Sequence, residues 1–535
     1  MDGATPVQSR PVSVEERTDA SDRRDGPDGT PSAPSPPTWL VALALVVALA
    51  GSVTRFLTTS ALWLDEALSV NIATLPLGDI GEALRHDGHP PLYYVLLHLW
   101  TGLFGTGDVA VRSLSGVIAV ATLPLAWVVG RRAGDATLGW LTVLVLGALP
   151  FATRYGTEAR MYTLVMALVF AGWLTLQRAL EQPSWGRLAL VSLVSGALLL
   201  THYWSFYLLG ATGLVLVVRW WQAEGEARRT TFRVTAAVVA GGILFLPWLP
   251  SFLEQARSTG TPWAEPERPT KVLAQLFSDL GGVDNAERIL FAMVLGLLLL
   301  LGLFGRSRDA STIELDLRTR PEARIELLVA VLTLAVAVAV GYLANSSFAP
   351  RYLAMVAPLV VLGAAWGLHR FTGSFALGVA LTAFLATSAF GVIDVITQQR
   401  TQMDDLASVV EQRGAAGDVV VYCPDQIGPA GSRALDGDFT QLTYPDLAAP
   451  EFVDWVDYAD RNAASSPEAF VDAVLEQAEG QTIWLAWSPE YITLETQCAQ
   501  VQHLLAQARP GNGPAVQADS GVFFENANLH QYPAS

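Results

Sequence analysis

The chain has 535 residues, of which 51% are apolar and only 16% are charged, and its formal net charge is −17. The apolar residues gather in runs of about twenty, each able to cross the ~30 Å hydrocarbon core of a bilayer. This composition argues against an ordinary soluble protein and indicates one with many membrane spans.

From Ile396 onward, the chain has 20 acidic residues and only five arginines. A surface this acidic repels phosphate backbones, which argues against nucleic acid as a partner.

The N-terminal segment is rich in Pro, Ser, Asp and Arg and has almost no large apolar side chains. It cannot bury enough apolar surface to fold, so residues 1–37 are predicted to be a disordered cytoplasmic tail. The first apolar run begins near Trp39 and lacks a short apolar core followed by a small-residue cleavage site. This pattern argues against a cleavable signal peptide.

Eleven apolar runs predict membrane-spanning helices. They lie at roughly 38–57, 110–130, 136–152, 161–178, 187–202, 204–220, 233–252, 288–305, 325–344, 353–369 and 373–395. The stretch from Pro91 to Phe104 is not counted, because its helix would be only ~21 Å long, which favours an interfacial or re-entrant helix. With the N-terminus inside, eleven spans place most loop arginines in the cytoplasm, as the positive-inside bias requires. The predicted outer segments are then 58–109, 151–160, 253–287, 345–352 and the tail after Ile396.

The tail has the pattern of a soluble α/β region and contains no Gly-rich phosphate loop. Helices are predicted at 401–413 and 467–478, and strands at 419–422 and 482–487. The two cysteines, Cys423 and Cys498, match no zinc spacing. They would form a disulfide in an extracytoplasmic region or remain buried thiols, and the sequence leaves both alternatives open. The predicted fold class is an α-helical polytopic membrane protein (residues 38–395) with a small, acidic, extracytoplasmic α/β C-terminal domain (residues 396–535).

Two adjacent carboxylates, Asp65 and Glu66, follow the first apolar run. A carboxylate at the membrane surface suits general-base work on a hydroxyl when burial and nearby cations set its pKa. The structural alternative is a solvated acid that caps a helix. Further along the same outer segment, His86, Asp87 and His89 could hold a divalent ion or simply face water.

Three further sets of polar residues lie on the predicted outer side, around Glu158, Arg351 and His202. Around the first, Glu158 and Tyr162 would lie on one face of a helix that starts near Glu158. With the arginines beside them they could bind a sugar and an anion, although Tyr and Arg also serve as interface anchors. Arg351 suits a phosphate because its planar guanidinium gives two parallel hydrogen bonds, unless it snorkels to lipid headgroups. His202 lies at the outer turn between two other spans.

Five short motifs therefore occur in order on one side of the predicted membrane domain. They are Trp63-Leu64-Asp65-Glu66, His89-Pro90-Pro91-Leu92-Tyr93-Tyr94, Glu158-Ala159-Arg160-Met161-Tyr162, Thr201-His202-Tyr203 and Arg351-Tyr352. Together they resemble the type C glycosyltransferase superfamily, specifically bacterial proteins of glycosyltransferase family 39 and of the dolichyl-phosphate-mannose protein mannosyltransferase kind. The resemblance covers most of residues 38–395. It implies an integral membrane enzyme that takes a sugar from a polyprenyl-phosphate carrier and gives it to an acceptor outside the cytoplasm.

The resemblance also implies roles for individual residues, with the catalytic outer loops at 58–109 and 151–160. Asp65 would be the general base, with Glu66 beside it and Glu158 as a third catalytic acid. The residues expected to bind substrate are His89, Tyr93, Arg160, Tyr162, His202, Tyr203, Arg351 and Tyr352. Among these, Arg351 would hold the lipid phosphate. The displacement would invert the anomeric carbon and require no cofactor, while a divalent ion at Asp87 and His89 is left open.

The expected sugar is mannose or a related hexose or pentose, and the acceptor an extracytoplasmic protein, glycan or lipid. The protein would lie in the plasma (inner) membrane, surrounded by the lipid bilayer, with its N-terminus cytoplasmic and its C-terminal domain outside. One rival hypothesis is a transporter or lipid flippase, which would place charges near the bilayer midplane and show internal repeats. Another is a receptor whose acidic tail binds a partner, in which Asp65 could be replaced without effect.

Overall fold

The computed structural model describes residues 35–259, 268–282, 287–343, 348–510 and 513–534. Residues 36–535 form one compact unit. Nearly all of the tail predicted at 1–37 lies outside the described residues, as do parts of the predicted outer segments 253–287 and 345–352.

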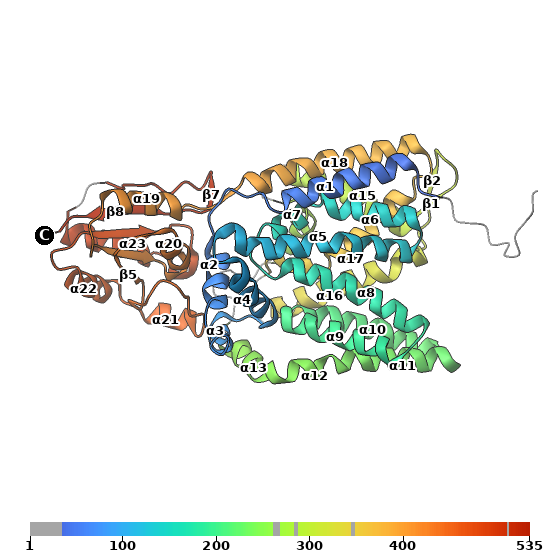
Figure 1. Ribbon diagram of the computed structural model, residues 1–535, viewed down its shortest axis with the longest axis horizontal. Coiled ribbons are helices and arrows are strands. Elements are labelled where there is room, and N and C mark those ends of the chain that lie inside the picture. Colours follow the sequence, from blue (N-terminus) through green and yellow to red (C-terminus); the bar gives the residue numbers. More distant parts are fainter. Residues whose placement is uncertain (1–34, 260–267, 283–286, 344–347, 511–512, 535) are drawn as a thin grey trace, which may run out of the picture. The chain divides into compact units, whose positions relative to one another are not determined.

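A helix lies in each of the eleven ranges predicted to span the membrane (Figure 1). These helices are α1 (Thr38–Thr54), α5 (Asp108–Ala133), α6 (Ala136–Ala148), α8 (Tyr162–Glu181), α9 (Trp185–Thr201), α10 (Ser205–Gln222), α11 (Gly225–Ala240), α15 (Glu287–Phe304), α16 (Pro321–Leu343), α17 (Ala357–His369) and α18 (Ser374–Thr397). Within the described residues, six helical stretches are long and apolar enough to cross a membrane, or seven if the bent pair of α6 and α7 (Pro150–Gly156) is one span. The count of eleven spans stays a prediction.

One of these stretches is longer than its predicted span. It covers Gly225–Ser258, whereas the apolar run predicted 233–252. It passes from α11 through α12 (Gly242–Phe245), η1 (Leu246–Trp248) and α13 (Leu249–Ser258). Its last part, α13, contacts α3 (Ile80–Asp87), a helix in the predicted outer segment 58–109.

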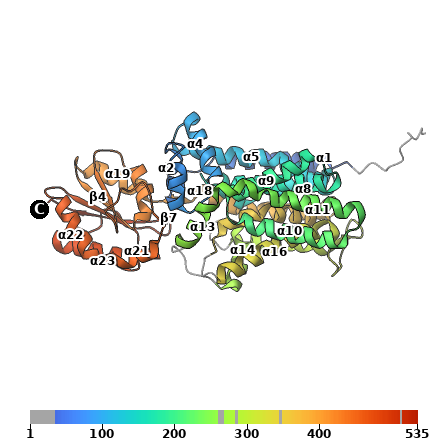
Figure 2. The same ribbon diagram turned by 90° about the horizontal axis from the view of Figure 1, so that it is seen from below.

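The helices of the predicted membrane region run alongside one another (Figure 2). α5 packs against α6 and α8, and α17 packs against α15 and α6. Glycines allow the closest approaches, because a Cβ on Gly367 of α17 would collide with the Leu298 carbonyl of α15, and one on Gly302 with the Gly363 carbonyl. Small residues serve the same purpose between helices in membranes generally.

Three short helices follow one another in the predicted outer segment 58–109: α2 (Leu64–Ala73), α3 and α4 (Leu92–Phe104). α3 ends at Asp87 and is followed by Gly88, whose φ of +87° is a conformation that glycine adopts without strain. The chain then turns through two prolines into α4, so the helix predicted from Pro91 to Phe104 is present. α2 contacts both α4 and the tail helix α20 (Gly428–Ala434). The helix that carries Asp65 and Glu66 therefore has neighbours from the membrane region and from the tail.

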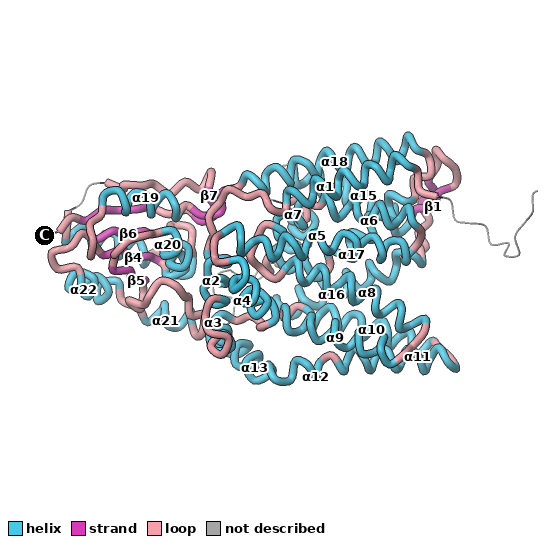
Figure 3. Tube along the Cα trace, in the orientation of Figure 1, coloured by secondary structure: helices cyan, strands magenta, loops and turns pink. Residues whose placement is uncertain are grey.

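The tail contains a four-stranded sheet, and its strands are drawn in magenta in Figure 3. In spatial order its strands are β5 (Thr440–Thr443), β4 (Val419–Cys423), β6 (Ile483–Trp487) and β8 (Asn528–Tyr532). The first three are parallel, and β8 is antiparallel to β6 with Leu485 opposite His530. Every residue of β4 is buried, because α19 (Met403–Arg413) and α20 cover one face and α22 (Pro467–Gln477) and α23 (Gln497–Ala508) cover the other.

The helices and strands predicted for the tail are present as α19, β4, α22 and β6, with slightly shifted ends. The strands β5 and β8 and the helix α23 were not predicted. Cys423 of β4 and Cys498 of α23 form a disulfide, one of the two alternatives left open. That the tail is a separate domain stays a prediction.

The remaining elements of the described chain are α14 (Pro269–Asp279), β1 (Gly305–Ser307), β2 (Ile313–Leu315), η2 (Pro350–Met355), β3 (Gln399–Thr401), η3 (Asp425–Ile427), α21 (Tyr458–Ala464), η4 (Ile492–Leu494) and β7 (Phe523–Glu525).

Candidate active site

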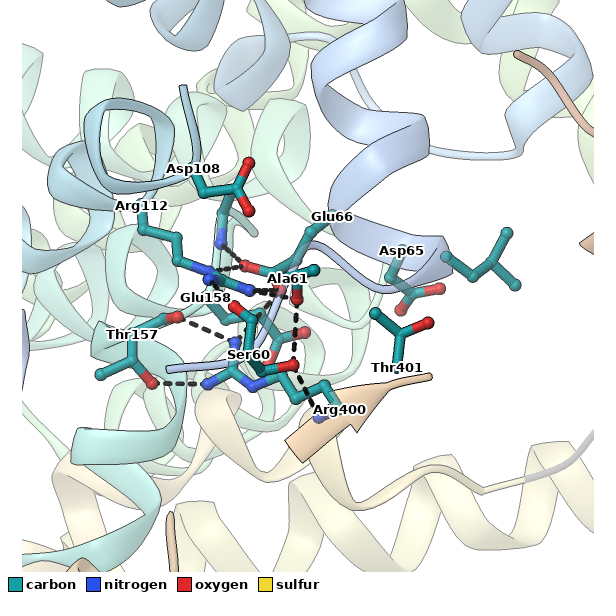
Figure 4. A network of polar contacts seen from close by, with 12 residues as sticks. Ser60, Ala61, Asp65, Glu66, Asp108, Arg112, Thr157, Glu158, Arg400 and Thr401 are labelled. Carbon is teal, nitrogen blue, oxygen red and sulfur yellow. Dashed lines mark hydrogen bonds and ion pairs between the residues drawn. The ribbon is translucent and has the colours of Figure 1, made fainter. Parts of the chain in front are cut away.

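The first turn of α2 presents its two acids in different directions (Figure 4). Asp65 and Glu66 are neighbours in a helix, so their side chains leave the axis roughly 100° apart. Glu66 points into a group of charged and hydroxyl residues, and Asp65 lies to one side of that group. The two carboxylates therefore have different surroundings.

Glu66 is fully buried and bonded to two arginines. Arg112 of α5 donates from Nε to Oε1 over 2.7 Å and from Nη2 to Oε2 over 2.6 Å, and Arg400 donates to Oε2 over 3.1 Å. The backbone N–H of Ala159 donates to Oε1 over 2.9 Å. Burial alone would raise the pKa of Glu66, but the charges of Arg112 and Arg400 lower it to about 2. Glu66 is thus an ionised acid with both oxygens occupied, which suits a structural ion pair better than proton transfer.

Asp65 forms a more accessible ion pair. Its Oδ2 accepts a hydrogen bond from Nη1 of Arg351 over 2.5 Å, and Nη2 of Arg160 lies 3.8 Å from the same oxygen. The Asp65 side chain is 16% exposed, whereas that of Glu66 is 0% exposed. Arg351 belongs to η2 and Arg160 to the turn before α8, so three predicted motifs that are distant in the sequence meet at one carboxylate. At such a site the two guanidinium groups can contact an anion while the carboxylate contacts a hydroxyl.

Arg160 links this carboxylate to the loop after α3. Its Nη2 lies 3.0 Å from Nε2 of His89. A guanidinium can only donate, so Nε2 must accept and Nδ1 must carry the ring proton. Nδ1 of His89 then donates to Oδ2 of Asp87 over 2.8 Å, and the Tyr94 hydroxyl donates to the same oxygen over 2.8 Å. His89 is therefore held in one tautomer and one orientation beside the Asp65 site.

The surroundings of Asp87 and His89 do not suit a divalent ion. Both ring nitrogens of His89 are engaged, and the Arg160 guanidinium lies where a metal would approach Nε2. His86, the third residue of the predicted group, pairs with Asp454 of the tail over 3.0 Å. In the part of the chain that the structure describes, no three His, Cys, Asp or Glu side chains are grouped as metal ligands. The divalent-ion hypothesis thus finds no support at these residues.

Glu158 lies in a turn and not on the helix predicted to begin near it. α8 begins at Tyr162, and the Ala159 N–H is directed to the Glu66 carboxylate instead of to a helical carbonyl. The prediction that Glu158 and Tyr162 share one helix face is therefore wrong. Glu158 is buried, its Oε2 lies 3.5 Å from Nε of Arg154, and that oxygen has no hydrogen-bond partner among the described residues. Burial raises the pKa of Glu158, although the charge of Arg154 opposes the shift.

Three of the predicted aromatic residues are grouped together. The ring centroids of Tyr162 and His202 are 5.9 Å apart, and those of His202 and Tyr352 are 5.4 Å apart. Tyr352 follows Arg351 directly in η2, so this group adjoins the cation that bonds Asp65. Tyr162 and His202 are buried, so these rings pack mainly against one another beside Arg351.

Two residues that were predicted to bind substrate, Tyr93 and Tyr203, form hydrogen bonds away from Asp65. The Tyr93 hydroxyl lies 3.0 Å from Oγ of Ser115, and its side chain is fully buried between α4 and α5. The Tyr203 hydroxyl accepts from Nε1 of Trp248 over 2.9 Å and donates to Gln255. These hydroxyls join neighbouring helices, and the structure does not bring them to the first turn of α2.

The two arginines around Glu66 were not predicted from the sequence. A signal existed for Arg112, because a charge within an apolar run is costly and is usually paired. Arg400 follows the last predicted span directly, where arginine is an ordinary interface anchor. Nothing in the sequence pattern connects it to a carboxylate 334 residues away.

Residues 88–250 match the family of the dolichyl-phosphate-mannose-protein mannosyltransferases. This stretch is less than half of the chain. It includes His89, Glu158 and Arg160 but neither Asp65 nor Arg351. No curated protein matches the sequence.

Two solved structures of one protein have a similar fold over nearly the whole chain. ArnT from Cupriavidus metallidurans bound to undecaprenyl phosphate matches with a TM-score of 0.57 and 14% identity, covering 93% of this chain and 98% of that one. Its apo state matches with a TM-score of 0.55 and 13% identity, covering 92% and 97%. At such identities the likeness concerns the fold. The predicted resemblance to the dolichyl-phosphate-mannose protein mannosyltransferases is thus confirmed in sequence over residues 88–250, and the ArnT structures share the fold over nearly the whole chain.

Proposed function

We propose that this chain is a membrane glycosyltransferase that moves a sugar from a polyprenyl-phosphate carrier to an acceptor outside the cytoplasm. The observation that carries the proposal is the Asp65 carboxylate beside two cations, with Arg351 at 2.5 Å and Arg160 at 3.8 Å. A displacement at a phosphorylated sugar requires a base for the incoming hydroxyl and positive charge for the departing phosphate. The fold supports the proposal, because a similar structure holds undecaprenyl phosphate.

In the proposed reaction, Asp65 removes the proton of an acceptor hydroxyl. The resulting oxygen attacks the anomeric carbon, and the bond from that carbon to the phosphate oxygen breaks, so that its electron pair leaves with the lipid phosphate. Attack and departure on opposite faces invert the configuration. Arg351 and Arg160 offset the charge that grows on the departing phosphate, and one cation at 4 Å contributes ~4 kcal/mol at an effective dielectric constant near 20.

The ion pair of Asp65 with Arg351 suggests an order of events. Arg351 donates to Oδ2 of Asp65, and the proposed order takes this to be the oxygen that receives the proton. The phosphate of a lipid donor offers a guanidinium two parallel hydrogen bonds. Its arrival would draw Arg351 toward the donor and release the Asp65 oxygen for the acceptor hydroxyl. Donor binding would therefore precede the action of the base.

Replacing Arg351 with Gln is expected to lower kcat about 10²-fold, because the cation at the departing phosphate is lost. Arg351→Lys keeps the charge but not the two-pronged geometry, so its loss should be smaller. Sugar release from the lipid donor in detergent measures both variants. Arg318→Gln, in an exposed loop, is the matched control and should be unchanged. Full activity of Arg351→Gln would remove the phosphate-holding role.

The proposed substrates follow from the same chemistry. Mannose or a related hexose or pentose would be the sugar, and a protein, glycan or lipid outside the cytoplasm the acceptor. The phosphate ester already activates the sugar, so no nucleotide cofactor takes part. The disulfide of Cys423 with Cys498 supports an extracytoplasmic tail, because disulfides persist in oxidising compartments. With eleven spans, the N-terminus would then be cytoplasmic, in the plasma (inner) membrane.

The test uses sealed membranes that contain the protein and a polyprenyl-phosphate-linked radiolabelled mannose. We expect label to leave the lipid over time, faster than in membranes without the protein, and a panel of other lipid-linked sugars would identify the best donor. A transporter or lipid flippase would move the labelled lipid across the membrane intact. The proposal is lost if no lipid-linked sugar in the panel is cleaved above background while labelled lipid changes sides.

A further inference from the structure

Two short strands of the tail reach the helix that carries Asp65. β3 and β7 pair in parallel, with Thr401 opposite Glu525. Arg400 of β3 and Glu525 of β7 both contact the first turn of α2. One side chain is a cation and the other an acid, and both are almost completely buried.

Glu525 caps the N-terminus of α2. Its Oε2 accepts from the Leu64 N–H over 3.1 Å and from the Tyr491 hydroxyl over 2.9 Å, and its Oε1 accepts from the Thr401 hydroxyl over 2.7 Å. The N–H groups in the first turn of a helix have no partner within it, and an acid there also interacts favourably with the helix dipole. The residue at the N-cap position, Trp63, supplies no side-chain acceptor. The cap therefore comes from a strand 461 residues further along the chain.

Arg400 bonds the same turn of α2 through Glu66, the second acid of that turn. It donates from Nη1 to Oε2 of Glu66 over 3.1 Å and to the Thr157 carbonyl over 2.8 Å, and from Nη2 to the Thr157 hydroxyl over 2.6 Å (Figure 4). Its backbone N–H donates to Oγ of Ser60 over 2.7 Å. Arg400 thus joins α2 to the turn that leads to Arg160.

We propose that Arg400 and Glu525 are positioning residues through which the tail fixes the first turn of α2, and with it the Asp65 carboxylate, relative to Arg351 and Arg160. This inference rests on the proposed function of Asp65. The three groups that meet at the site come from separate elements, so their spacing depends on what holds each element. A displacement of about 1 Å in a catalytic group is enough to lower a rate ~10²-fold.

The experiment compares three variants of the full-length protein. Glu525→Ala removes the cap and should lower kcat for sugar release ~10-fold or more, with the KM for the lipid donor changed less than about threefold. Glu525→Gln can still accept from the Leu64 N–H and Tyr491, while its amide can donate to Thr401, so it should restore kcat to within about threefold of the wild type. Glu476→Ala, an exposed acid of α22, is the matched control and should behave as the wild type.

A second measurement follows the stability of α2 directly and does not depend on enzymatic activity. Hydrogen exchange of the peptide 64–73, followed by mass spectrometry, should become faster in Glu525→Ala and stay slow in Glu525→Gln and Glu476→Ala. If Glu525→Ala does not fold, Glu525→Asp tests the same point, because its shorter side chain withdraws the acceptor while keeping a carboxyl group. The expected result for Glu525→Asp is intermediate, in both kcat and exchange.

The two proposals fail in different ways. If Glu525→Ala keeps the wild-type kcat and the wild-type exchange of α2, Glu525 does not position this helix, whatever Asp65 does. If the Glu525 variants shift the exchange of α2 as expected but Asp65→Asn still transfers sugar, the capping contact is real and the role of Asp65 is wrong. A fall in kcat that Glu525→Gln does not restore would also overturn the positioning role, because the cap would then not be the cause.

Discussion

Asp65→Asn is expected to lower kcat for sugar transfer about 10³-fold, because the amide cannot take the proton of the acceptor hydroxyl. Asn has nearly the same shape and still offers an oxygen to Arg351, which now bonds the acid over 2.5 Å. Donor binding should therefore change little, and the loss should appear in kcat rather than in KM. Single-turnover cleavage of a polyprenyl-phosphate-linked sugar, with donor binding measured separately, distinguishes these two effects.

Asp79→Asn is the matched control, because Asp79 is an exposed acid directly before α3 in the same outer segment. It should transfer sugar at the wild-type rate. If Asp65→Asn keeps the wild-type rate, the base is another group. Glu158 would then be the next acid to replace, since it is buried and its Oε2 has no hydrogen-bond partner among the described residues.

The sequence predicted the members of the Asp65 site better than their contacts. Asp65, Arg160 and Arg351 were each placed on the outer side by the order of the apolar runs, and the structure brings all three together. This was possible because a membrane restricts where a polar residue can lie, so the apolar pattern fixes on which side each loop falls. The pairing of Arg351 with Asp65 could not be predicted, because 286 residues separate them.

The different surroundings of the Asp65 and Glu66 carboxylates could not be predicted from the sequence, for another reason. Adjacent acids have the same local context, and only their tertiary partners distinguish them. Glu66 points toward Arg112 and Arg400, which come from α5 and β3, whereas Asp65 points toward η2. The helix expected to start near Glu158 is absent for the same reason, because Glu66 takes the backbone N–H of Ala159 that such a helix would have used.

Glu66→Gln is expected to destabilise the fold by about 3 kcal/mol or more, because it leaves two buried guanidinium groups without a full counter-charge. The pKa of Glu66 is about 2 in the folded protein and 4.5 for a free side chain. The ionised acid therefore stabilises the fold above pH 4.5, and this stabilisation is lost as the pH falls from 4.5 through 2. Thermal unfolding in detergent should thus separate the variant from the wild type at pH 7, and the separation should shrink toward pH 3.

The control and a double variant show whether the buried charges are the cause. Glu82→Gln breaks an exposed ion pair with Arg85, so it should change the stability by less than about 1 kcal/mol. Adding Arg400→Met to Glu66→Gln should cost much less than Arg400→Met costs alone, because the arginine it removes has already lost its counter-charge. Simple addition of the two losses would mean that the residues act independently. In that case Glu66 would stabilise the fold through Arg112 alone, and the contact between β3 and α2 would contribute little to stability.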